Sequence, residues 1–229
     1  MTATAGCHAV GHRGDPYVQR ENTLPSIRSA VRAGAQAVEI DVRLTRDGVP
    51  VLLHDATLER LWRQDRPLAR LSAAEVRGLT GGGVPTLHEA LALTESVRTL
   101  VDLPDAAAAS AAVAGARESG AADRVYYCGS VAAMRAVRRA DPAAELALTW
   151  TTLAPPRPTL LAELRPRWIN YRFGLLSRAL VDRNHADGLL VSAWTADTRW
   201  SMSRLLTVGV DAITTNRVGA LCALLATRR

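Results

Sequence analysis

A regular alternation of short apolar and amphipathic segments runs along almost the whole chain and leaves few folds open to it. Apolar runs predict strands at residues 7–12, 37–43, 99–103, 124–128, 145–150, 168–171, 188–194 and 210–214. Helical patterns rich in alanine, leucine and arginine fill the intervals, for example at 24–33, 105–118, 130–139, 177–186, 198–207 and 217–227. Strands that are each followed by a helix predict a parallel sheet, here in one α/β domain covering residues 1–229.

We expect this sheet to close into a single (β/α)8 barrel, a TIM barrel. An open doubly wound sheet that binds a dinucleotide carries a glycine-rich fingerprint after its first strand, and the segment after residue 12 has none. Right-handed crossovers bring the carboxyl ends of all barrel strands to one face, where barrel enzymes carry their chemistry. Polar residues at strand ends are therefore the first candidates for a functional site.

The segment after the second strand breaks the alternation and predicts a β-hairpin extension. Asp47-Gly48 between two apolar runs is a strong hairpin signal. If these are the only two turn residues, His54 lies opposite Asp41, and a bulge or longer turn would shift this pairing by a residue or two. Residues 55–85 then predict a loop with one short helix near 72–79, in which the glycines at 81–83 form a flexible connection.

Three carboxylates at neighbouring strand ends predict a metal site. Glu39 and Asp41 are two residues apart on the second strand and so share a face, and Asp102 ends the third strand. Clustered carboxylates repel one another unless a proton or a cation lies between them, and an all-oxygen set suits Mg2+ or Ca2+ better than zinc. The competing interpretations are solvated acids on an edge strand, and Asp102 as the cap of a helix that starts near Asp105.

Two histidines flank this acidic group. His12 ends the first strand and His54 ends the hairpin, so both converge on the second strand from opposite sides. A lone histidine in a strand is usually structural, and we read those at positions 8, 88 and 185 in that way. A pair of imidazoles beside a metal suits acid-base cleavage of a phosphodiester, with Arg13 binding a phosphate oxygen.

Composition excludes several classes of protein. The net charge is +6, but every basic residue is arginine and the arginines alternate with acids, which argues against a nucleic-acid partner. No run of about 18 apolar residues predicts a membrane-inserted helix. Three widely spaced cysteines form neither a zinc motif nor a disulfide framework, and the first ten residues do not have the pattern of a signal peptide, so we expect a cytoplasmic protein.

Together, these motifs resemble the glycerophosphodiester phosphodiesterase family. The resemblance rests on Gly11-His12-Arg13-Gly14, Glu21-Asn22-Thr23-Leu24, Gly34-Ala35, Val38 to Val42, Thr45 to Gly48 and Val51 to Asp55, and later on Val84 to Leu87 with Glu89, Trp194-Thr195 and Gly209 to Thr214. It implies a small-molecule glycerophosphodiester substrate and a divalent cation, Mg2+ or Ca2+. The implied roles are acid and base for His12 and His54, metal ligands for Glu39, Asp41 and Asp102, and substrate contacts for Arg13, Glu21 and Trp194.

The chain departs from the family at two places. The family usually has Glu-x-Lys where this sequence has Asp102-Leu103-Pro104, and the chain contains no lysine that could replace the missing one. We expect an arginine to supply the charge to phosphate, with Arg172 as the candidate. The late Thr-Asp of the family is Thr215-Asn216 here.

Three functions remain open at this point. The first is hydrolysis of a glycerophosphodiester by water or by an internal hydroxyl of the substrate. The second is headgroup release from a lysophospholipid or sphingolipid, as in the similar sphingomyelinase-D-type phospholipases, with an apolar groove that Trp150, Leu175 and Trp194 could line. The third is a catalytically silent barrel that binds phosphate esters. The sequence identifies neither the alcohol, nor which histidine is the base, nor the oligomeric state.

Overall fold

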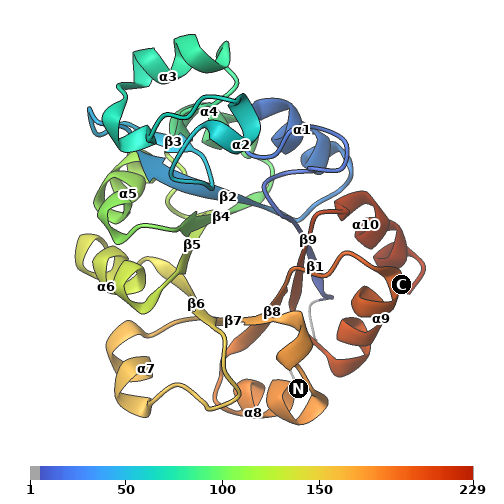
Figure 1. Ribbon diagram of the computed structural model, residues 1–229. Coiled ribbons are helices and arrows are strands. Elements are labelled where there is room, and N and C mark those ends of the chain that lie inside the picture. The colour runs from blue at the N-terminus through green and yellow to red at the C-terminus, as the bar shows by residue number, and fades with distance from the viewer. Residues whose placement is uncertain (1–5, 229) are drawn as a thin grey trace.

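The computed structural model describes residues 6–228 and contains a closed ring of parallel strands with helices around it (Figure 1). The strands are β1 (His8–Gly11), β2 (Ala37–Leu44), β3 (Pro50–Leu52), β4 (Arg98–Leu103), β5 (Val125–Gly129), β6 (Glu145–Trp150), β7 (Trp168–Arg172), β8 (Leu190–Trp194) and β9 (Ala212–Thr215). Their order is β1-β9-β8-β7-β6-β5-β4-β2-β3, and pairing of β1 with β2 closes the ring. The predicted (β/α)8 barrel is confirmed, with β3 bonded to its outside.

The helices cover the outer surface of the ring (Figure 1). They are α1 (Leu24–Arg32), α2 (Glu59–Trp62), α3 (Ala73–Thr80), α4 (Leu87–Leu93), α5 (Ala109–Glu118), α6 (Val131–Ala140), α7 (Pro158–Leu164), α8 (Arg178–Ala186), α9 (Arg199–Val208) and α10 (Val218–Ala226). Short 3-10 turns lie at Leu68–Arg70, Ala106–Ala108 and Phe173–Leu175. None of the helices within residues 6–228 combines the length and apolar character that crossing a bilayer requires.

The two faces of β2 show how the sequence positions polar groups inside the barrel. Val38, Ile40 and Val42 belong to the large apolar cluster between the sheet and the helices. The alternate residues point into the ring, where a second apolar cluster contains Val10, Ala37, Leu100, Tyr126, Cys128, Ala147, Trp168 and Ala212. Glu39 and Asp41 follow Ala37 on this inner face, so the carboxylates lie nearer than Ala37 to the carboxyl end of β2.

The hairpin forms, but its predicted register is wrong by one residue. Val42 pairs with Leu52, and Leu53, not His54, lies opposite Asp41, with Leu53 N donating to the Asp41 carbonyl oxygen at 3.1 Å. The loop contains three residues, because Gly48 adopts φ 78° and its N–H bonds back to the Thr45 carbonyl oxygen. A left-handed glycine at the end of such a loop is the usual three-residue alternative to the two-residue turn.

The segment after the hairpin has more structure than predicted. Besides α3, which confirms the helix expected near 72–79, it contains the four-residue α2 and a separate apolar cluster built around Leu58, Leu68 and Val76. The glycines at 81–83 are not merely a flexible connection. Gly81 ends α3 in a left-handed conformation, and a Cβ on Gly83 would lie 2.0 Å from the Trp62 ring. Gly83 therefore provides the space into which Trp62 packs.

Candidate active site

The three predicted acids come together at the carboxyl ends of β2 and β4. Asp41 pairs with Asp102 in the parallel register, and Glu39, Asp41 and Asp102 each offer an oxygen within 4.8 Å of the others. Asp105, not Asp102, caps the following turn, because its carboxylate accepts the Ala107 N–H at 2.9 Å. The alternative interpretation of Asp102 as a helix cap is therefore wrong.

The proximity of these acids changes their protonation. Burial, and then the charges of Asp41 and Asp102, raise the pKa of Glu39 well above its ordinary value. Burial and the charge of Asp41 raise the pKa of Asp102 to about 6. Closely spaced carboxylates that resist ionisation together are stabilised by a cation with oxygen ligands. The donor set therefore fits a divalent cation such as Mg2+ or Ca2+.

His12 follows β1 and is held by an amide rather than by a carboxylate. Its Nδ1 lies 2.7 Å from Asn216 Oδ1, while Asn216 Nδ2 and N donate to the two oxygens of Asp197 at 2.7 and 2.8 Å. Since Asn216 presents its oxygen to the ring, Nδ1 carries the proton and Nε2, 4.0 Å from Glu39, is left to accept one. Burial and the charge of Arg13 lower the pKa of His12, so its neutral form predominates.

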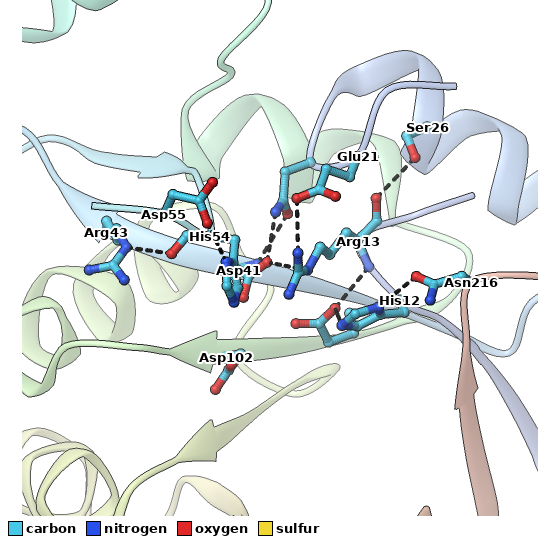
Figure 2. A network of polar contacts seen from close by, with 12 residues as sticks. His12, Arg13, Glu21, Ser26, Asp41, Arg43, His54, Asp55, Asp102 and Asn216 are labelled. Carbon is cyan, nitrogen blue, oxygen red and sulfur yellow. Dashed lines mark hydrogen bonds and ion pairs between the residues drawn. The ribbon is translucent and has the colours of Figure 1, made fainter. Parts of the chain in front are cut away.

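His54 is held by a carboxylate. Its Nδ1 lies 2.7 Å from Asp55 Oδ1, and the side chain is 42% exposed. The backbone of His54 is fixed as well, because Arg43 Nε donates to its carbonyl oxygen at 2.8 Å. Figure 2 shows His12 and His54 on opposite sides of Asp41, with Asp102 on the neighbouring strand. The two histidines thus differ in the charge of their partners.

The loop between β1 and α1 holds Arg13 against the acids. Arg13 Nη1 bonds to Glu21 Oε1 at 2.9 Å, its Nε lies 3.0 Å from Asp41 Oδ2, and its backbone N–H donates to Glu39 at 2.8 Å. Asn22 is nearly fully buried and bonds twice to Asp41, through Nδ2 to Oδ2 at 2.7 Å and through Oδ1 from the Asp41 N–H at 3.1 Å. Both Arg13 and Asn22 adopt a φ of 54°, so this loop is bent back over the carboxylates.

A cavity of about 490 Å³ opens beside these groups. It is lined by His12, Arg13, Glu39, His54, Leu100, Asp102, Leu103, Pro104, Cys128, Gly129, Ser130, Thr149, Thr151, Asn170, Trp194 and Thr214. The indole Nε1 of Trp194 is buried and has no hydrogen-bond partner among residues 6–228. Pro104, at the position of the family's lysine, is part of this wall.

Three of the predicted site residues, Glu21, Asp41 and Arg172, do not line the cavity. Arg172 is exposed at the end of β7, so its predicted contact with phosphate stays a prediction. Glu21 bonds to Arg13 and Arg60 instead. Of the apolar groove expected from Trp150, Leu175 and Trp194, only Trp194 lines the cavity.

Sequence reasoning missed several groups that support the site. No role is assigned to Asn22 from the sequence, yet it bonds to Asp41, while Thr23 caps α1. Asp55 and Arg60 were not assigned roles. Asp55 could have been found from its position directly after His54, but Arg60 lies on a short helix with no periodic signal. Its contact with Glu21 spans 39 residues, which local patterns do not encode.

The sequence profile described as the glycerophosphoryl diester phosphodiesterase family matches residues 12–220. The chain belongs to this family. It is 25% identical over 230 residues to a glycerophosphodiester phosphodiesterase from Caldanaerobacter subterraneus subsp. tengcongensis, covering 90% of this chain and 93% of that protein. It is 30% identical over 234 residues to "Probable glycerophosphodiester phosphodiesterase 2" of Mycobacterium tuberculosis, covering 93% and 88%. The resemblance found in the sequence is confirmed.

Solved structures share the fold of this family member. A glycerophosphodiester phosphodiesterase from Thermotoga maritima has a TM-score of 0.85 at 20% identity, covering 96% of this chain and 99% of that one. An Oleispira antarctica phosphodiesterase, solved with the product sn-glycerol-3-phosphate, has a TM-score of 0.85 at 22% identity, covering 96% of each. Mammalian relatives match over a shorter stretch: glycerophosphodiester phosphodiesterase 1 of Bos taurus is 38% identical over 96 residues, 37% of this chain and 29% of that protein.

Proposed function

We propose that this protein hydrolyses glycerophosphodiesters to sn-glycerol 3-phosphate and an alcohol, using a divalent cation and two histidines. The observation that carries the proposal is that His12 and His54, with partners of different charge, line one cavity together with Glu39 and Asp102. Family membership and the product complex of the Oleispira antarctica relative support the substrate class.

The three carboxylates would hold the cation. Mg2+ or Ca2+ bound by Glu39, Asp41 and Asp102 would withdraw charge from a non-bridging phosphate oxygen and orient the nucleophile. Asn22 and the backbone N–H of Arg13 hold the orientation of Asp41 and Glu39 through direct hydrogen bonds. Ligands fixed in this way keep their geometry when the cation arrives.

We assign the base to His12 and the acid to His54. His12 accepts a proton at Nε2 from the attacking water, or from an internal hydroxyl of the substrate, since its Nδ1 already donates to Asn216. His54 donates a proton to the departing alkoxide, and Asp55 Oδ1, 2.7 Å from its Nδ1, holds the ring in place for that transfer. The phosphorus–oxygen bond to the alcohol breaks as the new one forms, and one proton is taken up and one released. Attack by an internal hydroxyl would give a cyclic phosphate, which a water molecule would then have to open to the monoester.

We further assign substrate contacts to Arg13 and Trp194. Arg13 lines the cavity and would place positive charge beside phosphate, and the unpaired Nε1 of Trp194 would donate to a phosphate or hydroxyl oxygen. Glu21 holds Arg13 in place, and Arg172 remains the candidate for the missing lysine's charge. The cysteines at positions 7, 128 and 222 are free, which fits the proposed cytoplasmic, single-domain hydrolase.

An assay with three substrates tests this function against its alternatives. The protein is incubated with glycerophosphocholine, lysophosphatidylcholine and bis(p-nitrophenyl) phosphate, each with Mg2+, Ca2+ or EDTA. We expect turnover of glycerophosphocholine with a cation and none with EDTA. Turnover of the lysolipid alone would favour headgroup release from lipids. An absence of turnover under every condition would favour a silent barrel.

Substitution of the histidines tests the mechanism. His12→Ala and His54→Ala should each lower kcat by roughly 10²- to 10⁴-fold, the usual contribution of a general acid or base. Thermal unfolding should change little, because His54 is partly exposed and neither ring belongs to the apolar core. A variant that retains the activity of the unmodified protein would remove that histidine from the mechanism.

A further inference from the structure

A single guanidinium connects the two halves of the candidate site. Arg60 Nε lies 2.5 Å from Asp55 Oδ2, and its Nη2 lies 2.6 Å from Glu21 Oε1. Asp55 holds the ring of His54 through its other oxygen, and the same Glu21 oxygen holds Arg13. The path therefore runs from His54 through Asp55, Arg60 and Glu21 to Arg13, which is ion-paired with Asp41. Several of these residues are drawn in Figure 2.

The two halves belong to separately packed parts of the molecule. His54, Asp55 and Arg60 come from the segment after β3, which has its own apolar cluster around Leu58. The helices of this segment, α2 and α3, lie outside the barrel ring (Figure 1). Arg13 and Glu21 come from the loop between β1 and α1. A second contact joins these parts, because the Arg20 guanidinium lies 4.3 Å from the centroid of the Trp62 ring. Both contacts pass through α2.

We propose that Arg60 is a positioning residue that fixes the distance between His54 and the Arg13–carboxylate group, and so sets the geometry for catalysis. It holds the two carboxylates through neighbouring nitrogens on one edge of a planar fork, an arrangement that the single ammonium of a lysine cannot reproduce. The inference rests on the proposed function. It adds to that function a residue outside the cavity lining, which acts only through Asp55 and Glu21.

Because Arg60 is exposed, its effect on catalysis can be measured apart from any effect on the free energy of unfolding. Its side chain is 47% exposed, and ion pairs at that exposure add little to the free energy of unfolding. The carboxylates nevertheless respond to it. Burial acts to raise the pKa of both carboxylates, but hydrogen bonds outweigh it and lower both pKa values. Those bonds come from Arg60 and His54 at Asp55, and from Arg60 and Arg13 at Glu21. Loss of Arg60 should therefore leave folding nearly unchanged and disturb the site.

The experiment compares Arg60→Gln, Arg60→Lys and Arg60→Ala with a matched control, Arg46→Gln. Arg46 also connects this segment to the hairpin, because its guanidinium bonds to Glu75 and to the Arg70 carbonyl oxygen. It contacts neither Asp55 nor Asn216, the partners of the two histidines. We expect Arg60→Gln to lower kcat roughly 10- to 100-fold, the effect of a misplaced catalytic group, with little change in KM. Arg60→Lys should recover only part of the loss, and Arg46→Gln should match the unmodified protein.

Two further measurements keep the inference testable if a variant folds poorly or the protein lacks the proposed activity. Free guanidinium chloride at millimolar concentration should restore part of the kcat of Arg60→Ala and have no such effect on His54→Ala. Without substrate, the ¹⁵N and ¹H signals of the His54 Nδ1–H group should change in Arg60→Gln and stay unchanged in Arg46→Gln. Normal kcat with unchanged His54 signals in Arg60→Gln would overturn the inference. Absence of turnover in the unmodified protein would contradict the proposed function alone, and the NMR comparison would still decide this one.

Discussion

At the scale of single residues, the two catalytic candidates differ in the group behind each ring. His12 faces the neutral amide of Asn216, and the negative charge of Asp197 lies one hydrogen bond further away. The family usually has an aspartate where this chain has Asn216. A carboxylate directly behind the ring would favour the protonated imidazole, whereas an amide leaves the ring neutral and ready to accept a proton.

Exchanging the two partners tests this reasoning. In Asn216→Asp combined with Asp197→Asn, the hydrogen bonds between positions 197 and 216 can be kept, while the negative charge moves next to His12. This should raise the pKa of His12, so the base becomes protonated at higher pH. We expect the acidic limb of the kcat/KM profile to move up by about one pH unit. An unmoved limb, measured with saturating cation, would show that His12 is not the group that titrates there.

Asn22 and Thr23 offer a second comparison at this scale. Asn22→Ala leaves a buried charged carboxylate without one of its donors and should lower the free energy of unfolding by about 2 kcal/mol, together with a loss of activity. Thr23→Ala removes the cap of α1 and the hydrogen bond from Thr23 Oγ1 to the Arg20 carbonyl oxygen, but no contact with Asp41, and should lower it by about 1 kcal/mol with activity intact. Urea unfolding and initial rates measure both. Equal effects of the two substitutions on activity would show that Asn22 acts only as part of the helix start.

These residues also show where sequence reasoning ends. Glu39, Asp41 and His12 could be placed because strand periodicity and the parallel order of strands fix which side chains meet at one face. Asn22, Arg60 and Asn216 could not, because their roles depend on loop conformations and on contacts between distant segments. A residue's type and neighbours do not determine the path of a loop.

At the scale of secondary-structure elements, the hairpin shows how one residue decides a register. The sequence predicts the two strands and the position of the turn, but not its length, because the left-handed Gly48 adds a third residue to the loop. Leu53 therefore takes the place opposite Asp41, and His54 follows the last strand pair, where its ring meets Asp55. The Asp-Gly pair is compatible with both loop lengths, so the alternation of side chains alone does not choose between them.

Gly48→Ala should reveal how much this loop conformation contributes. A Cβ at position 48 would meet no atom within 4 Å, so the substitution introduces only the strain of a positive φ. We expect the free energy of unfolding to fall by about 1 kcal/mol, with kcat unchanged. Gly83→Ala should lower the free energy of unfolding by more than Gly48→Ala does, because its Cβ would collide with the ring of Trp62, the last residue of α2. If Gly48→Ala were harmless, the loop would have to relax into another turn, which backbone NMR shifts at residues 45–49 would detect.

At the scale of the whole molecule, closure of the ring sets the order in which groups meet. β2 lies between β1 and β4, so Glu39 and Asp41 have His12 on one side and Asp102 on the other. Inside the ring, the second apolar cluster contains side chains from most of the strands. The polar groups are consequently confined to the open end, where burial and mutual repulsion act on them together.

This confinement predicts a linkage between pH, cation and stability. The pKa of Asp102 is raised to about 6 and that of Glu39 is raised well above its ordinary value, so without cation the folded protein holds protons that the unfolded chain releases. Stability of the cation-free protein should then fall as pH rises from about 4 through about 6, because an acid with a raised pKa is stabilised by folding only while protonated.

A cation competes with those protons, so its effect on stability must grow as pH rises. We expect Mg2+ or Ca2+ to raise Tm little at about pH 5 and substantially at about pH 7.5, since binding to deprotonated ligands strengthens up to tenfold per pH unit for each proton displaced. Thermal unfolding with cation and with EDTA at both pH values measures this difference. Asp102→Asn should reduce this difference without abolishing it, because the amide has no proton to lose in this range whereas Glu39 still has one. Equal increments in Tm at both pH values would mean that the cation binds elsewhere, since no site built from these acids can escape the competition.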